Sequence, residues 1–184
     1  MFSKNFFLNS DDLKKTGIKC GKNCLIHSTV NISNFKNIIL GDNVRIDAFC
    51  NIISSKKIFI GSYVHVASYV ILYANKKSIK LDKLCGISAG VQIYSHTDDY
   101  LGNSFFGPFN KKRNSGKSKN ILVGKYSIIG SNSIILPGSI IPEGVSVGAL
   151  SLVSHKLEPW GVYKGNPAVY ILPRKKIFLR NFKL

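Results

Sequence analysis

Acidic residues are scarce in this chain, and long apolar runs are absent. Of 184 residues only 9 are Asp or Glu, against 26 Lys or Arg, so the formal net charge is +17 although 19% of the residues are charged. No stretch reaches the roughly 18 consecutive apolar residues of a membrane-spanning helix. The start, MFSKNFFLNS, lacks the apolar core and cleavage site of a secretory signal. Because 45% of the residues are hydrophobic, disorder is excluded for most of the chain, and we expect one cytoplasmic domain over residues 1–184.

Neither the helical period nor the two-residue strand period runs through the chain, because an aliphatic residue recurs at every sixth position. The unbroken part of this series consists of Val123, Ile129, Ile135, Ile141, Val147 and Val153. Small or β-branched residues stand four positions later, and Gly or Asp often follows the aliphatic residue directly. This period is typical of a parallel β-helix, whose stacked coils bury a column of aliphatic side chains. We therefore predict an all-β fold with regular coils at residues 26–96 and 121–154.

Residues 97–120, TDDYLGNSFFGPFNKKRNSGKSKN, interrupt the period. A segment this long is usually functional or disordered. We expect a loop that leaves the β-helix as an arm and helps to form the acceptor site, with Phe105, Phe106 and Phe109 docking on a neighbouring subunit; a mobile insertion is the alternative. Smaller interruptions at Ile38-Ile39 and Ile58-Phe59 predict local bulges or widened turns. Residues 155–184 form a short C-terminal extension.

Cysteine is too sparse to suggest a metal site. Cys24, Cys50 and Cys85 fall on the small positions of the repeat and Cys20 on the aliphatic ones, so we interpret all four as core residues. A zinc site would need paired Cys or His at short spacing, and we predict no metal. The chain also lacks a basic helix, a zinc finger, and aromatic residues interleaved with Lys and Arg on a strand. We therefore expect no nucleic-acid partner, and the basic surface leaves association with an anionic membrane open.

The C-terminal repeats resemble a known family. In residues 123–171 the runs GSNSIILPG, VGALSLV and GVYKGNPA follow one another as in the closing coils of hexapeptide-repeat acyltransferases, above all the galactoside, maltose and capsular-polysaccharide O-acetyltransferases. The resemblance implies a left-handed parallel β-helix assembled as a homotrimer. It also implies acetyl-coenzyme A as the acyl donor, bound in the groove between adjacent subunits.

Histidine is the side chain best suited to take a proton from the acceptor near neutral pH. His96, in VQIYSHTDDY, stands where the family carries its catalytic histidine, and we predict that it is the general base. His27 and His65 lie on the repeat surface and are interpreted as structural.

Three polar residues are candidates for binding the acceptor. Asp98 and Asp99 follow His96 and would orient its ring or bind sugar hydroxyls; as the alternative, they are solvated ion-pair partners. Asn75, in LYANKK, resembles the Asn of the YAN segment that faces the acceptor in the galactoside enzymes.

By the same resemblance, coenzyme A lies along the last coils. Small residues there would let the pantetheine arm approach the backbone, and basic residues would hold the phosphates. The predicted cofactor-binding residues are Gly130, Ser131, Gly148, Ala149, Ser154, His155, Lys156, Arg174 and Lys175, with Lys176 beside them. Val169 and Leu172 depart from the family, which often carries basic residues there. For each basic residue a solvated surface role is the alternative.

The sequence thus predicts an acetyl-coenzyme A-dependent acetyltransferase that moves an acetyl group to a sugar hydroxyl, in the biosynthesis of a surface polysaccharide such as O-antigen or capsule. One alternative is an N-acetyltransferase that acts on a nucleotide-linked amino sugar. The other is a structural β-helix without catalytic activity.

Overall fold

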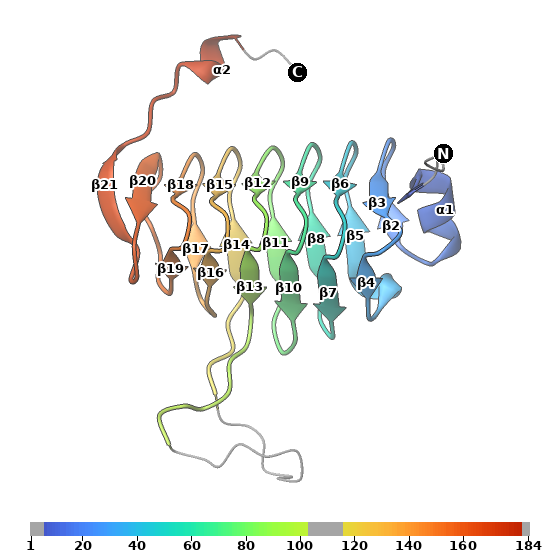
Figure 1. The fold of residues 1–184 in the computed structure, drawn as a ribbon, viewed down its shortest axis with the longest axis horizontal. Coiled ribbons are helices and arrows are strands. Elements are labelled where there is room, and N and C mark those ends of the chain that lie inside the picture. Colours follow the sequence, from blue (N-terminus) through green and yellow to red (C-terminus); the bar gives the residue numbers. More distant parts are fainter. Residues whose placement is uncertain (1–5, 103–115, 182–184) are drawn as a thin grey trace.

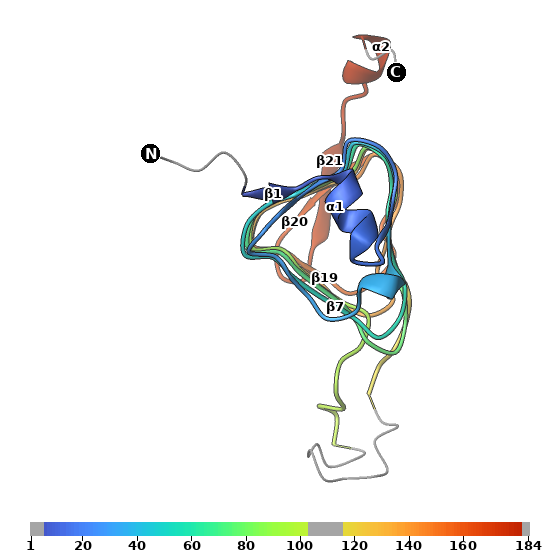
Figure 2. The ribbon, with the colours of Figure 1, turned by 90° about the vertical axis from the view of Figure 1, so that its right-hand side faces the viewer.

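The computed structural model describes residues 6–102 and 116–181, which form a solenoid of short strands stacked along one axis (Figure 1). Each coil contributes one strand to each of three sheets, which we name A, C and B in the order in which the chain visits them. Viewed along the axis, the coils superpose as a triangle (Figure 2). The predicted left-handed parallel β-helix is therefore confirmed.

The strands are short and, apart from two pairs at the ends, parallel. Sheet A contains β1 (Phe7–Leu8), β3 (Leu25–His27), β6 (Arg45–Ile46), β9 (His65–Val66), β12 (Gly86–Ile87), β15 (Ile128–Ile129), β18 (Ser146–Val147), β20 (Gly161–Lys164) and β21 (Val169–Pro173). Sheet C contains β4 (Asn31–Ile32), β7 (Asn51–Ser54), β10 (Ile71–Ala74), β13 (Gln92–Tyr94), β16 (Ile134–Ile135) and β19 (Leu152–Val153). Sheet B contains β2 (Lys19–Cys20), β5 (Ile38–Leu40), β8 (Ile58–Ile60), β11 (Ile79–Leu81), β14 (Ile121–Val123) and β17 (Ile140–Ile141). The antiparallel pairs are β1 with β3 and β20 with β21.

The six-residue series forms the core. In sheet A, for example, Ile46 pairs with Val66 and Val66 with Ile87 on successive coils, and all three are almost completely buried. Burying one such side chain contributes about 1.5–3 kcal/mol. A register shift would turn the whole column to solvent, so the hydrophobic pattern fixes the stacking.

The cysteines belong to this core, as predicted. Cys24, Cys50 and Cys85 are buried, and Cys20 is partly buried and packs against the core. Burial raises the pKa of the Cys50 thiol to about 11 and that of the Cys85 thiol to about 12. These thiols therefore stay protonated at neutral pH and act as small apolar side chains.

Three corners connect the sheets, and we name each by the sheets it joins: the A–C, C–B and B–A corners. Ile38, Ile39, Ile58 and Phe59, where the period is interrupted, lie within the regular strands β5 and β8. The additional residues precede these strands at the C–B corner, as the short 3-10 helix η1 (Phe35–Asn37) and as residues 55–57. The interruptions are therefore widened turns and not bulges.

The segment predicted as a loop also leaves the solenoid at the C–B corner, between β13 and β14 (Figure 1). Phe105, Phe106 and Phe109 lie outside the described residues, so their docking on a neighbouring subunit stays a prediction.

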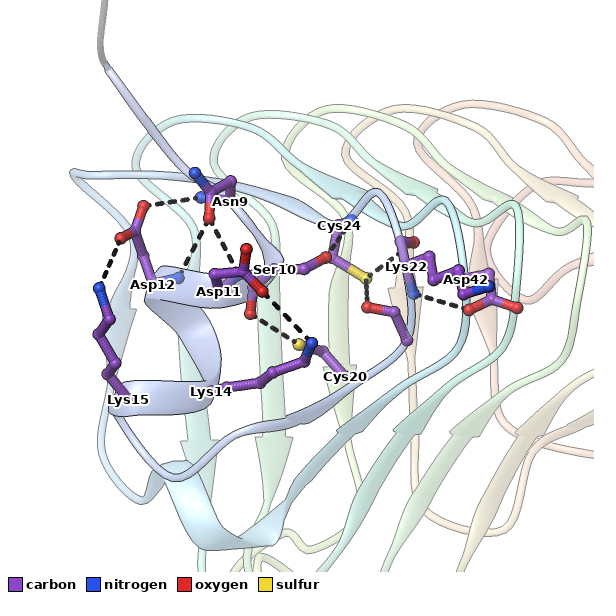
Figure 3. A network of polar contacts seen from close by, with 11 residues as sticks. Asn9, Ser10, Asp11, Asp12, Lys14, Lys15, Cys20, Lys22, Cys24 and Asp42 are labelled. Carbon is purple, nitrogen blue, oxygen red and sulfur yellow. Dashed lines mark hydrogen bonds and ion pairs between the residues drawn. The ribbon is translucent and has the colours of Figure 1, made fainter.

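Helix α1 (Ser10–Lys15) closes the N-terminal end of the solenoid (Figure 3). The Asn9 side chain accepts hydrogen bonds from the backbone N–H groups of Asp11 and Asp12, which caps the helix. Ser10 Oγ accepts a hydrogen bond from the Cys24 N–H at 2.8 Å, and the buried Leu13 covers the first coil.

At the other end, helix α2 (Phe178–Asn181) follows the β20–β21 hairpin. No helix within residues 6–102 and 116–181 is long and apolar enough to span a membrane.

Candidate active site at the C–B corner

His96 lies at the C–B corner, where the chain leaves the solenoid after β13. Its backbone forms an antiparallel bridge with Ser118, and the Thr97 N–H donates to the Lys117 carbonyl at 3.0 Å, so the two limbs of the arm are joined there. His96 Nδ1 lies 2.8 Å from Ser118 Oγ, and only 8% of the residue is exposed. The imidazole is thus fixed by contacts at the base of the arm.

The surroundings of His96 favour its neutral form. Burial and the nearby positive charge of Lys76 lower its pKa below the ordinary 6.5, while Asp98 opposes this shift. His96 Nε2 and Asp98 Oδ1 are 3.8 Å apart, too far for a direct hydrogen bond. His96 can therefore accept a proton at neutral pH, as a general base must.

The predicted acceptor-binding residues lie near the same corner. Asn75 follows β10 on the preceding coil, and its Nδ2 donates to the Tyr73 hydroxyl at 3.3 Å. Ser95, next to His96, donates hydrogen bonds from its backbone N–H to the Tyr73 carbonyl and from its hydroxyl to the Lys77 carbonyl. These bonds join the C–B corners of the two successive coils. Asn75, His96 and Asp98 therefore lie at the C–B corner of two successive coils.

Asp99 continues the arm next to Asp98. Its carboxylate accepts a hydrogen bond from the Leu101 N–H at 3.0 Å, within the first limb of the arm.

The residues predicted to bind pantetheine lie on another corner. Gly130, Ser131, Gly148 and Ala149 occupy the A–C corner of two successive coils. A Cβ on Gly130 would lie 2.5 Å from the Ala149 backbone nitrogen. Close packing between coils therefore already requires glycine at position 130, whether or not a ligand binds there.

The predicted phosphate-binding residues are divided between the two remaining corners. Ser154 and His155 follow β19 at the C–B corner, and Lys156 ends this corner with a parallel bridge to Ile140 of β17. Arg174 packs instead on the B–A corner, where its Nη1 donates to the carbonyl of Tyr126 at 2.6 Å and also contacts the carbonyls of Gly144 and Val145.

Arg174 thus anchors the C-terminal segment, and the exposed Lys175 follows it. Within one chain the predicted cofactor-binding residues lie on three different corners and do not form one site.

Sequence reasoning missed two neighbours of His96. Ser118 stands 22 positions after it and Lys76 belongs to the preceding coil, and neither occupies a repeat position that would mark it. Only the spatial stacking of the coils brings them together.

Among the residues that the structure describes, no group of three or more His, Cys, Asp or Glu could hold a metal ion.

Comparison with known proteins identifies relatives of nearly the same length. A variant of the N-acyltransferase AntD from Bacillus cereus, in complex with dTDP-4-amino-4,6-dideoxyglucose and coenzyme A, is 38% identical and superposes with a TM-score of 0.90 over 97% of each chain. Another AntD structure, in complex with dTDP and 3-hydroxybutyryl-CoA, is 37% identical, with a TM-score of 0.90 over 96% of this chain and 94% of the other.

A relative known from its sequence is a dTDP-4-amino-4,6-dideoxy-D-glucose acyltransferase from Escherichia coli, 35% identical over 105 residues. The match covers 56% of this chain and 55% of that protein, so the chain spans about half the length of this relative. No protein-family model matches the chain.

The predicted acceptor, a sugar hydroxyl in surface polysaccharide biosynthesis, is wrong. The solved relatives that match almost the full chain at 37–38% identity are N-acyltransferases. A maltose O-acetyltransferase from Clostridium difficile 630 is only 23% identical, with a TM-score of 0.55 over 90% of this chain and 74% of the other, and that likeness shows the fold alone. The alternative, acyl transfer to an amino sugar linked to a nucleotide, is favoured instead.

Proposed function

We propose that this chain, which belongs to the hexapeptide-repeat left-handed β-helix acyltransferases, is a coenzyme A-dependent N-acyltransferase that acts on dTDP-4-amino-4,6-dideoxyglucose. The observation that carries the proposal is the 38% identity, over 97% of both chains, to an N-acyltransferase in complex with that sugar nucleotide and coenzyme A.

In the proposed reaction the neutral amine attacks the thioester carbonyl. A C–N bond forms, the C–S bond breaks, the amine loses one proton, and the thiolate of coenzyme A takes one up. His96 would accept the amine proton, because burial and Lys76 keep its imidazole neutral. General-base assistance of this kind typically contributes about 10²–10⁴-fold in rate. Asp98, 3.8 Å from His96 Nε2, would stabilise the positive charge on the amine or on the imidazolium.

We propose acyl-coenzyme A as the donor, with acetyl-coenzyme A as the first choice and a longer acyl group as the alternative. The relative AntD, in complex with 3-hydroxybutyryl-CoA, makes the longer group worth testing. The pantetheine arm would run along the A–C corner at Gly130, Ser131, Gly148 and Ala149.

The division of the site between corners supports a homotrimer. The A–C corner carries the proposed pantetheine contacts, whereas His96 and the segment from Ser154 to Lys156 lie on the C–B corner of the same chain. A site that uses both corners is complete only when the C–B corner of one copy faces the A–C corner of the next. The assembly would act in the cytoplasm.

The proposal is tested with two acceptors that differ in one group. Release of free coenzyme A thiol is measured from acetyl-CoA and 3-hydroxybutyryl-CoA in the presence of dTDP-4-amino-4,6-dideoxyglucose or dTDP-glucose, and the product is identified by mass spectrometry. We expect turnover with the amino sugar only and a product that resists hydroxylamine, as an amide does. Turnover with dTDP-glucose alone, or with neither acceptor, would overturn the proposal.

A further inference from the structure

Two exposed aromatic rings lie on top of one another at the A–C corner. Phe49 follows β6 and Tyr69 follows β9 on the next coil; their ring centroids are 5.2 Å apart and their planes are inclined by 20°. Phe49 is 50% exposed and Tyr69 is 60% exposed. His27 continues the row toward the N-terminal end, with its ring centroid 6.5 Å from that of Phe49. We call the Phe49–Tyr69 pair the aromatic platform.

The platform residues adopt a backbone conformation that disfavours bulky side chains. Their φ angles are 61° and 63°, in the left-handed region. The same position of the A–C corner holds Gly90, Asn132 and Leu150 on later coils, with φ angles of 71°, 56° and 57°. Gly and Asn are the residue types that tolerate this region best. The fold accepts bulky side chains at this position, as Leu150 shows, but does not require them, so the exposed, stacked rings of Phe49 and Tyr69 are free to serve a binding role.

The platform shares its edge with the proposed coenzyme contacts. Backbone hydrogen bonds connect the corner coil by coil, from Tyr69 N to Ala48 O, from Gly90 N to Ser68 O and from Asn132 N to Ala89 O, at 3.0–3.1 Å. Gly130 and Gly148 continue the same edge toward the C-terminal end. One edge thus carries two exposed aromatic rings at its N-terminal coils, and Gly130, Gly148 and the exposed Leu150 at its C-terminal coils, with the coil of Gly90 between them.

This division suits two substrates that meet end to end. If coenzyme A occupies the C-terminal coils with its nucleotide toward the end of the solenoid, its thioester points to the coil of Gly90. The acceptor must then approach from the N-terminal coils, over the platform. Two coil spacings, about 10 Å, separate Tyr69 from Asn132, which leaves room for the diphosphate and the sugar between the base and the thioester.

We infer that the aromatic platform stacks against the thymine base of the acceptor nucleotide, an inference that rests on the proposed function for the identity of that nucleotide. A pyrimidine presents a flat π-face, and stacking on an exposed aromatic side chain is the usual way in which proteins bind a base without reading its edge. The platform would therefore contribute affinity for the nucleotide and take no part in the chemistry at the amine.

The test replaces each ring with a residue that suits the backbone. Phe49→Asn, Tyr69→Asn and the double variant remove the rings while relieving the unfavourable φ, so we expect folding to be kept and Tm to be equal or higher. Dissociation constants for dTDP and for coenzyme A are measured separately by calorimetry. We expect dTDP binding to weaken about 5- to 100-fold in the double variant and coenzyme A binding to stay unchanged. Tyr63→Asn is the matched control, because Tyr63 is an exposed tyrosine with φ 60° on the B–A corner.

The outcomes separate this inference from the proposed function. If the parent protein binds dTDP and the double variant binds it equally well, the inference is wrong and the proposed function stands. If the parent protein binds no dTDP, both fail. A change of oligomeric state in the double variant, seen by sedimentation and absent in Tyr63→Asn, would show that the platform is a contact between subunits and would also overturn the inference.

Discussion

The A–C and C–B corners of the solenoid differ in how they accept additional residues. The A–C corner has the same length in every coil from β6 onward, as residues 47–50, 67–70, 88–91, 130–133 and 148–151. The C–B corner varies from the short turn at residues 55–57 to the arm at residues 95–120. The constant corner preserves the register of the core, and the variable corner carries His96. The solenoid thus confines variation to one corner, where it leaves the stacking undisturbed.

The strongest test of this difference is His96→Ala at the variable corner. We expect kcat to fall about 100-fold, near the lower end of the range for general-base catalysis, because an amine acceptor is a better nucleophile than a hydroxyl. Affinity for coenzyme A should be kept, since the thioester is bound elsewhere. Steady-state kinetics with saturating acyl-CoA measure the loss.

His65→Ala serves as the control, because His65 is exposed on sheet A and bonds Asp47 at 2.7 Å. Turnover of His96→Ala within twofold of the parent would exclude His96 as the base and leave Asp98 or the substrate itself.

A second test concerns the glycines that the stacking requires. A Cβ on Gly61, at the B–A corner, would lie 2.5 Å from the Lys83 backbone nitrogen, whereas a Cβ on Gly86 in β12 would meet nothing within 4 Å. We expect Gly61→Ala to destabilise the fold by about 2–3 kcal/mol and Gly86→Ala to be neutral or slightly stabilising. Chemical denaturation of the two variants measures the difference. If Gly61→Ala and Gly86→Ala are equally stable, the coils can move apart locally at Gly61, and close packing does not determine the length of the corner.

The sequence predicted the fold well because a six-residue period has few physical interpretations. Ile46 pairs with Val66, and Val66 pairs with Ile87, as the period requires. Because all three side chains are buried, a shifted register would expose them, and only one register of the strands is stable. The sequence also named His96, Asn75 and Asp98 as candidates for one site, from their resemblance to the family and their closeness in the chain, and the structure places all three at the C–B corner. Arg174 was not predictable in this way. Its guanidinium bonds three backbone carbonyls, and no repeat position marks such a contact.

The acceptor was predicted wrongly for a different reason. A hydroxyl and an amine acceptor can use the same histidine as a base, so the residues around a candidate base do not reveal which group attacks.

A smaller effect is expected when the contact that orients His96 is removed. Ser118→Ala deletes the hydroxyl 2.8 Å from His96 Nδ1 and allows the ring to rotate. We expect kcat to fall about threefold to tenfold with an unchanged KM for the acceptor, because a single neutral hydrogen bond contributes about 0.5–1.5 kcal/mol. Ser118→Thr keeps the hydroxyl and should restore most of the rate. A loss in Ser118→Thr as large as in Ser118→Ala would show that Ser118 acts through packing and not through orientation of the base.

The smallest effect should come from the charge beside the base. Burial and Lys76 together hold the pKa of His96 below 6.5, so the parent enzyme should keep its active, neutral imidazole as the pH falls through 6.5 and lose activity only below that value. Lys76→Gln removes a positive charge that opposes protonation, so the pKa of His96 rises and the acid limb of the kcat profile moves to higher pH. Because Lys76 contributes less to the shift than burial does, we expect a loss of about twofold at pH 6 and none at pH 8, where the imidazole is neutral in both enzymes. Lys77→Gln changes the neighbouring charge, which does not contribute to the pKa shift of His96, and should leave the profile in place. If the acid limb of the pH profile stays in place in Lys76→Gln, or moves equally in both variants, the group that titrates in the profile is not His96.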